Sequence, residues 1–333
     1  MQSKNDSEQA VTQPKRGRGR LLFLLALMQI LALLFVAGLA RLFFYDRSLM
    51  LIWLNLFAFY LYLPAYLILV IAILMREKAL AITAVGIIAF HLTLVVPPLI
   101  PRANFDEAQP AGEVVRLFDA NLMFDNPETD AMIAEIEQAD ADVLIFQEYT
   151  SVWDGAFMGS WMESAYPYRF LNIIDSPFGS GIWSKRPLSD TEIWNTNGIE
   201  MVYATIEIDG LPVRLHDVHP PPPMRNYPRW EQMHNEIRQS AADESIPVVL
   251  VGDFNMGQHN LFYKNLLNQG FYSLHQELGR GMATTWPNGK ENAPPVRLDH
   301  AFVSPELIGL FITEGIGAGS DHRPLIIDIA LSD

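Results

Sequence analysis

The stretch Val248-Val249-Leu250-Val251-Gly252-Asp253-Phe254-Asn255 decides the fold of this chain. Its first four residues form a continuous apolar run, which is typical of a strand that is buried on both faces of a sheet. Asp253 and Asn255 follow the run two residues apart, so in an extended segment their side chains point to the same side. The stretch therefore predicts a buried strand that ends in a pair of polar side chains.

Polar residues also stand at the ends of other predicted strands. The run 142–148 ends in Gln147-Glu148, the run 215–219 ends in His219, Asp299 opens the strand 298–303, and Ser320-Asp321-His322 precedes the strand 325–329. Each carboxylate alone would more often be a turn former or a helix cap. Together they offer carboxylates, an amide and imidazoles in a chain without cysteine. Such hard ligands suit Mg²⁺ or Mn²⁺.

The patterns from residue 113 to residue 333 predict one α/β domain. We expect a helix that begins at Asn126 as N-cap with Pro127 at its first position, and a second helix with Trp230, Met233 and Ile237 on one face. Strands are expected at 114–120, 143–146, 182–184, 201–208, 213–218, 248–251, 298–303 and 325–329. Many strands with few helices favour a layered α/β sandwich over a regular βαβ alternation. The proline run 220–223 is either one wall of a cleft or a rigid spacer.

The first third of the chain is predicted to be a membrane anchor. Residues 21–40 and 48–75 carry no charge, and residues 79–100 carry only His91 as a titratable group. A transmembrane helix needs about 20 apolar residues, so three helices are expected at about 21–40, 49–75 and 79–100. Residues 1–20 are predicted to be a basic, disordered cytoplasmic tail. The Pro-rich segment 101–112 is predicted to be a linker to the domain at 113–333.

Charge divides the chain in the same way. Residues 1–104 hold ten Lys and Arg against four Asp and Glu, a net charge of +6, and the remaining residues have a net charge of −21. The tail carries more Lys and Arg than the loop after the first helix, which favours a cytoplasmic N-terminus and a domain outside the cytoplasm, in the periplasm or extracellular space. The acidic domain weighs against a sequence-tolerant nucleic-acid binder, whose affinity comes mostly from Lys and Arg on phosphates.

Five motifs then occur in the order that is found in the endonuclease/exonuclease/phosphatase family, and the chain resembles that family over residues 114–330. They are Phe118-Asp119-Ala120-Asn121, Gln147-Glu148, Val218-His219, Gly252-Asp253-Phe254-Asn255, and the closing pair Asp299-His300 with Ser320-Asp321-His322-Arg323-Pro324. The short-loop anchor with its His-Pro-Pro-Pro-Pro segment resembles a membrane-attached bacterial subset. The resemblance implies a four-layer α/β sandwich with two mixed β-sheets.

The resemblance also implies roles for site residues. Glu148 would be the main protein ligand of a Mg²⁺ or Mn²⁺ ion, with Asn121 close by and Asp321 completing the shell. Asp253 would orient or deprotonate the attacking water, Asn255 would hold a phosphate oxygen, and His322, paired with Asp299, would bind the scissile phosphate or transfer a proton. His219 would stabilise the transition state or protonate the leaving group. Met123 stands where some members have Asp, so one and two metal ions both stay open, as does the identity of the general base.

These observations favour a membrane-tethered, metal-dependent phosphoester hydrolase with an Asp-activated water. One alternative is a nuclease for extracytoplasmic DNA or RNA. Another is a non-catalytic sensor or scaffold, which the intact set Glu148, Asp253, Asn255, Asp299 and His322 disfavours. The expected partners are the lipid bilayer and a phosphoester, with a lipid headgroup preferred over nucleic acid.

Overall fold

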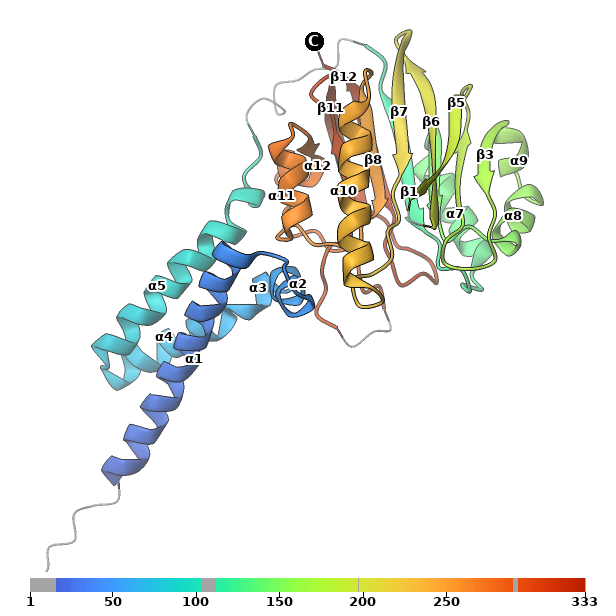
Figure 1. Ribbon diagram of the computed structural model, residues 1–333. Coiled ribbons are helices and arrows are strands. Elements are labelled where there is room, and N and C mark those ends of the chain that lie inside the picture. The colour runs from blue at the N-terminus through green and yellow to red at the C-terminus, as the bar shows by residue number, and fades with distance from the viewer. Residues whose placement is uncertain (1–15, 103–111, 197, 290–292, 333) are drawn as a thin grey trace, which may run out of the picture.

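Two six-stranded β-sheets form the centre of residues 113–332 in the computed structural model, which describes residues 16–102, 112–196, 198–289 and 293–332 (Figure 1). The first sheet has the order β11 (Leu307–Glu314), β12 (Leu325–Leu331), β1 (Val115–Asn121), β2 (Val143–Gln147), β4 (Ser180–Ser184) and β3 (Tyr168–Asn172). The second has the order β5 (Ser189–Thr196), β6 (Ile199–Ile208), β7 (Leu211–Asp217), β8 (Val248–Asp253), β10 (Asp299–Val303) and β9 (Tyr272–Ser273). Both sheets are mixed, since β1–β2 and β7–β8 pair parallel and their other neighbours pair antiparallel.

The two sheets pack face to face, and their central strands are buried on both sides. Along β8, Val249 and Val251 lie in the core between the sheets, whereas Val248 and Leu250 lie in the core beneath the helices of the second sheet. Successive residues in a strand point to opposite faces, so a strand between two cores must be apolar throughout. This explains the continuous run 248–251.

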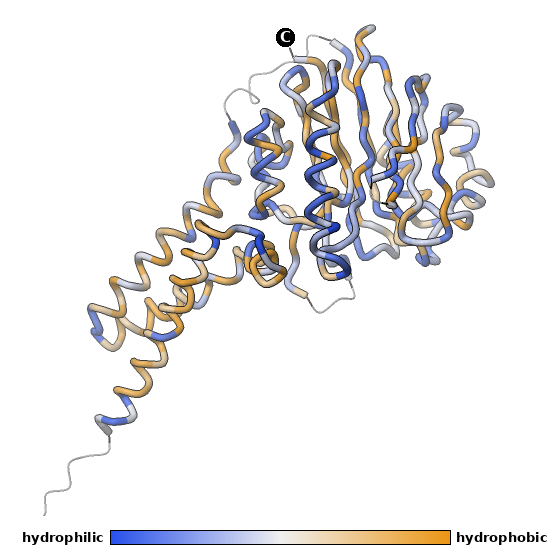
Figure 2. Tube along the Cα trace, in the orientation of Figure 1, coloured by the Kyte–Doolittle hydropathy of each residue, from blue (hydrophilic) through white to orange (hydrophobic). Residues whose placement is uncertain are grey.

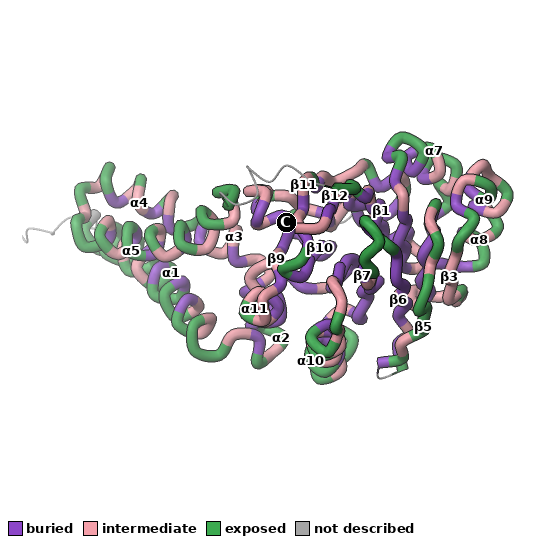
Figure 3. Tube along the Cα trace, turned by 90° about the horizontal axis from the view of Figure 1, so that it is seen from above, coloured by how far each residue is buried: buried purple, intermediate pink, exposed green. Residues whose placement is uncertain are grey.

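Helices cover the outer face of each sheet and complete four layers. Helices α7 (Thr129–Ala139), α8 (Ser151–Met158) and α9 (Met162–Ala165) pack on the first sheet, and α10 (Tyr227–Asp243) and α11 (Leu261–Asn268) pack on the second. Figure 3 shows buried strands between helices with exposed outer faces. The predicted four-layer sandwich of two mixed sheets is confirmed.

Most expected strands are present, but four edge or near-edge strands were missed. They are β3, β5, β9 and β11, and all but β9 carry exposed side chains among their residues. An edge strand packs less apolar surface, so β3 and β5 lack the apolar run that identifies a central strand, whereas Leu307–Glu314 is apolar but is interrupted by Gly309. The helix expected at Asn126 is a further correction: α7 begins at Thr129 after Glu128. The Asn126 side chain instead accepts from the Glu128 N–H and donates to the carbonyl oxygens of Leu122 and Ala318.

The first third of the chain forms a bundle of apolar helices beside the sheets, and Figure 2 shows hydrophobic residues along most of it. It consists of α1 (Arg16–Phe44), α2 (Leu49–Leu56), α3 (Ala58–Leu61), α4 (Leu63–Met75) and α5 (Lys78–Val95), followed by the short 3₁₀ turn η1 (Pro97–Leu99). Three segments are long and apolar enough to cross a membrane: Gly17–Phe44, Ala58–Met75 and Lys78–Val95. Only 22–28% of each is buried inside the protein. So much exposed apolar surface is unfavourable in water and is typical of lipid-facing helices.

The second predicted helix, 49–75, is not continuous. The chain bends at Phe57 and Tyr62, and only Ala58–Met75 has the length and composition of a span. Pro64 lies in the first turn of α4, where its missing N–H removes no intrahelical hydrogen bond. Asn55 is buried and hydrogen-bonds Asp46 and Arg41, so this polar end of α2 lies against protein.

Two further boundary predictions fall partly outside the described residues. Residues 16–20 of the expected tail belong to α1, and residues 1–15 lie outside. Pro101 and Arg102 of the expected linker 101–112 lie against α12 (Leu274–Glu277), where the Arg102 N–H donates to the Glu277 carbonyl oxygen at 3.0 Å, and residues 103–111 lie outside.

Candidate functional site

Strand pairing brings the polar strand ends of both sheets to one edge of the sandwich. The parallel strands β1 and β2 end side by side, with Asn121 opposite Gln147. In the second sheet β8 ends at Asp253, and the antiparallel strand β10 begins opposite it at Asp299. Because the carboxyl ends of parallel strands meet at one sheet edge, side chains that are distant in sequence converge there.

A cleft of about 340 Å³ lies at this edge and is lined by seven of the eight predicted site residues. They are Asn121, Glu148, His219, Asp253, Asn255, Asp321 and His322. The eighth, Asp299, is buried behind His322 and accepts a hydrogen bond of 2.8 Å from its Nδ1 atom. The structure thus brings the whole predicted set together.

Asn121 bridges the two central carboxylates. Its Nδ2 atom donates to Glu148 Oε1 at 3.2 Å and to Asp253 Oδ2 at 3.3 Å. The other Glu148 oxygen accepts the Phe124 N–H at 2.8 Å. Asn255 donates its backbone N–H to Asp253 Oδ1 and its amide to Asp253 Oδ2 and the Pro220 carbonyl oxygen. These contacts fix the direction of both carboxylates.

The site contains strained backbone. Glu148 and Asn255 have φ values of +59° and +48°, in the left-handed region that non-glycine residues rarely adopt. Such strain persists only where the surroundings over-determine it, and it clusters at functional sites. Gly252 has φ +139°, and a Cβ atom there would press on the Val218 carbonyl oxygen, which explains the glycine of the Gly-Asp-Phe-Asn motif.

The two histidines of the cleft differ in charge. Burial lowers the pKa of His219, so its imidazole is neutral at neutral pH. Burial alone would also lower the pKa of His322, but the carboxylates of Asp299 and Asp253 together outweigh it and raise that pKa to about 10. Each Nε2 atom lies 3.7 Å from Asp253 Oδ2. His322 is therefore a positively charged group that faces the cleft, and Arg225 also lines it.

The residues present fit a hard divalent cation. Burial raises the pKa of Glu148 and of Asp253, which means that both carboxylates have lost water around their charged form. A cation would restore that stabilisation, and carboxylate and amide oxygens are the ligands that Mg²⁺ prefers. Glu148, Asn121 and Asp321 all line the cleft.

A second group of potential ligands is Asp253, Asp299 and His322, whose nearest ligand atoms lie within 4.8 Å of one another. His322 already hydrogen-bonds Asp299 and is protonated at neutral pH. A metal ligand must be a neutral imidazole. The group of Glu148, Asn121 and Asp321 is therefore the better match to a metal centre, and the His322–Asp299 pair is better suited to binding an anion.

Three residues that lie outside the sequence motifs hold the loop before His322 in place. Glu135 on α7 is buried, and its carboxylate accepts the N–H groups of Ile316, Gly317 and Ala318. Asn126 donates to the Ala318 carbonyl oxygen, and Asn288 donates to carbonyl oxygens of the same loop, that of His322 included. Ser320 joins this loop to β1, because its hydroxyl donates to the Asn121 carbonyl oxygen at 2.7 Å. The only sequence signal was a Glu on the helix face otherwise formed by Met132, Ile136 and Ala139.

Removing the Glu135 carboxylate is expected to slow catalysis without touching the cleft. Glu135→Ala leaves N–H groups of the loop without an acceptor, at about 1–3 kcal/mol of stability, and a small displacement of His322 is expected to lower kcat about tenfold. Glu135→Gln, which keeps one acceptor oxygen, is expected to recover part of both losses. Turnover and thermal unfolding measure the effects, with Glu137→Ala on the exposed face of α7 as the control. A Glu135→Ala enzyme with wild-type turnover would show that the loop before His322 keeps its position without the Glu135 carboxylate.

A buried polar contact joins the two sheets beneath the cleft. Gln147 donates its amide to Asp119 of β1 at 2.8 Å and to Asp217 of β7 at 2.7 Å. Burial raises the pKa of both carboxyl groups well above the usual range. Gln147 therefore has a structural role next to its neighbour Glu148.

The N-terminal helical bundle also reaches the cleft, which no sequence pattern indicated. Ile52, Trp53 and Leu56 of α2 line it together with the predicted site residues. Pro221, Pro222 and Pro223 line it as well, so the proline run is a wall and not only a spacer.

Comparison with known proteins agrees with this architecture. The model of the Endonuclease/Exonuclease/phosphatase family matches residues 115–322. A comparison with curated proteins finds none that matches this chain.

Similar solved structures include D. rerio TDP2 in two forms. One is TDP2 humanized by 14 mutations, with 17% identity and a TM-score of 0.56 over 65% of this chain and 98% of that chain. The other is TDP2 complexed with a single strand DNA product, with 16% identity and a TM-score of 0.57 over 65% and 99%. An endonuclease/exonuclease/phosphatase from Beutenbergia cavernae DSM 12333 has 14% identity and a TM-score of 0.52 over 66% and 72%. At these identities the likeness shows the fold.

Proposed function

The chain belongs to the endonuclease/exonuclease/phosphatase family, whose members are hydrolases acting on phosphoester bonds, and we propose that it is a membrane-tethered member that depends on a divalent metal ion. The observation that carries this proposal is the convergence of Glu148, Asn121 and Asp253 with the His322–Asp299 pair in one cleft. A sensor or scaffold would have no need of this complete and strained set.

The proposed domains are a cytoplasmic tail at 1–20, an anchor at 21–100, a linker at 101–112 and a catalytic domain at 113–333. The proposed metal ligands are Glu148, Asn121 and Asp321, and Mg²⁺ or Mn²⁺ suits their oxygen atoms. When bound, such an ion polarises the phosphoryl group and neutralises the charge that develops on it.

The side chains of the cleft supply the remaining chemistry. Asp253 holds the attacking water by hydrogen bonding and accepts its proton, as a general base. His322 presents its Nε2–H to a phosphate oxygen while Asp299 keeps the imidazole oriented and charged. Asn255 donates its amide to Asp253 and Pro220, so a phosphate oxygen would replace one of these acceptors. His219 is neutral and acts as a hydrogen-bond partner of the leaving group.

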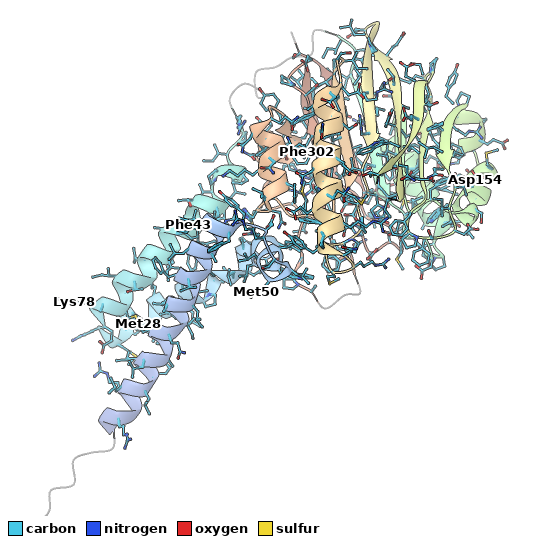
Figure 4. The ribbon with its side chains drawn as sticks, in the orientation of Figure 1. Met28, Phe43, Met50, Lys78, Asp154 and Phe302 are labelled. Carbon is cyan, nitrogen blue, oxygen red and sulfur yellow. The ribbon has the colours of Figure 1, made fainter. Side chains whose placement is uncertain are left out.

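Charge at the two ends of the helical bundle supports a cytoplasmic N-terminus. The sequence at 1–20 and 76–78 holds seven Lys and Arg, whereas the segments 41–48 and 96–102 hold three. Figure 4 shows Phe43 at the end of the bundle near the sheets and Lys78 at the opposite end. Positively charged segments are retained in the cytoplasm, so we propose that the catalytic domain is periplasmic or extracellular in a multi-pass protein of the cell membrane.

A reporter fusion tests this topology. An alkaline phosphatase fused after Asp333 is expected to be active, and a fluorescent protein that folds only in the cytoplasm is expected to be dark at the same position. The same reporters fused after Arg76, at the opposite end of the bundle, serve as a matched control and are expected to behave the other way round. The opposite pattern at both positions would reject the orientation.

A lipid or small phosphoester is proposed as substrate in preference to duplex DNA. Residues 105–333 carry a net charge of −21, and such a field repels a long polyanion unless a basic groove is present. Anchoring to the bilayer raises the local concentration of headgroups. With full-length protein, catalytic efficiency on lipid phosphodiesters in vesicles is expected to exceed that on plasmid DNA at physiological salt. Plasmid nicking that is tenfold faster would instead establish the nuclease.

A further inference from the structure

Helix α2 of the anchor is part of the catalytic domain's core. Ile52 is 1% exposed and belongs to the same apolar cluster as Val218 and Trp230, which lie beside and beneath the cleft. A Cβ atom on Gly257, just after the Gly-Asp-Phe-Asn motif, would lie 2.7 Å from Leu56 Cδ1. Figure 1 shows α2 between the bundle and the sheets. The anchor therefore packs directly against the loop that follows Asn255.

A buried polar network fixes α2 against the loop that carries Asp253 and Asn255. Asp46, which is 2% exposed, accepts from Asn55 Nδ2 at 2.6 Å, from Asn260 Nδ2 at 2.9 Å and from the Leu261 N–H. Asn260 also donates to the Ile52 carbonyl oxygen and accepts the Gly257 N–H. Asp46 thus accepts one of the N–H groups at the start of α11 that have no partner within the helix. Together these hydrogen bonds fix the position of α2 against the domain.

The wall that α2 contributes is apolar and rigid. Trp53 and Leu56 face the cleft, and the Trp53 ring stacks on Phe57 with centroids 5.5 Å apart and an interplanar angle of 1°. Phe178, Met224 and Phe124 extend the apolar lining, and the last two are 60% and 41% exposed. The cleft therefore combines the polar groups proposed for the phosphoester chemistry with hydrocarbon surface.

We propose that α2 is the apolar half of the substrate-binding site and that the substrate is an amphiphile, a phosphoester joined to a hydrocarbon chain. This inference rests on the proposed phosphoester hydrolysis. The hydrocarbon chain of the substrate lies against Trp53 and Leu56, while its phosphate group meets His322 and the metal ligands. Since α2 connects the end of one candidate span to the start of the next, its wall lies at the membrane surface, where the chain of a bilayer lipid is available.

A chain-length series on the full-length protein in nanodiscs tests the proposal. The probes are p-nitrophenyl alkyl phosphates from methyl to octyl, which share one scissile bond and differ only in hydrocarbon. Burial of each methylene favours binding about threefold to fourfold, so kcat/KM is expected to rise at least tenfold from methyl to octyl. Trp53→Ala and Leu56→Ala are expected to remove most of this rise.

A control separates binding to the wall from simple partitioning into the nanodisc. Partitioning would enrich long esters equally for every variant, so a rise that survives both Trp53→Ala and Leu56→Ala would overturn the proposal. Met50 lies on the same helix and is 67% exposed. The Met50→Ala variant is expected to keep the wild-type rise of kcat/KM with chain length. Thermal unfolding of each variant shows whether α2 remains docked.

The outcomes also separate this inference from the proposed function. No hydrolysis of any ester, the methyl ester included, would reject the proposed function itself. Hydrolysis of the methyl ester with a flat series would keep that function and overturn the role of α2. A loss of chain-length dependence in the two variants, with the Met50→Ala control intact, would establish the anchor as a specificity element.

Discussion

Asp253→Asn is expected to reduce turnover at least a hundredfold, because an amide cannot accept the proton of the attacking water. The substitution keeps the size of a side chain that is buried between Asn121, Asn255 and the two histidines. The measurement is kcat on the phosphodiester that the full-length enzyme hydrolyses fastest.

Asp130→Asn, on the exposed face of α7, is the matched control and is expected to retain full activity. His322→Ala, which removes a positively charged group that faces the cleft, is expected to cause a loss of the same order. Wild-type turnover in Asp253→Asn would reject the assignment of this carboxylate as the base and return the choice to the other groups of the cleft.

Removing the metal ion is expected to abolish activity, and Glu148→Gln is expected to lower turnover at least a hundredfold. Burial of Glu148 disfavours its charged form, which a cation would stabilise, and the amide of glutamine is a much weaker ligand. EDTA followed by titration with Mg²⁺ or Mn²⁺ measures the requirement. Glu148→Gln should also raise the metal concentration needed for half-maximal rate.

Glu137→Gln on the exposed face of α7 is the control for this substitution. Full activity in EDTA would contradict metal dependence outright. A Glu148→Gln enzyme that is slow but has an unchanged metal requirement would move the metal to the Asp253, Asp299 and His322 group.

The structure also bears on how the enzyme is prepared. A soluble fragment at 105–333 would lack Ile52, Trp53 and Leu56 from its cleft and Asp46 from the start of α11. Exposed apolar surface on the fragment would replace the buried contacts of α2. Full-length protein is therefore the appropriate sample for every measurement above.

The residue pattern alone predicted the layered fold and the set of residues that converge in the cleft. Central strands such as β8 must be apolar on both faces, so their runs are visible without a structure, and the polar residues that end them are conspicuous for the same reason. Because parallel strands end at a common sheet edge, Asn121 and Glu148 could be expected to meet. Asp253 ends a strand of the other sheet, and it reaches Asn121 only because the two sheets pack face to face. Apolar length alone likewise predicted three candidate spans.

Tertiary structure alone decided how the anchor and the loops complete the site. Leu49–Leu56 has the composition of a membrane helix, and composition does not distinguish contact with lipid from contact with the core that holds Trp230. Glu135 accepts hydrogen bonds from the loop before His322, which lies 180 or more residues later in the chain. Asp46 accepts the Leu261 N–H across a similarly long separation in sequence. Such contacts depend on where separate elements meet in space, and no local propensity or periodicity records that.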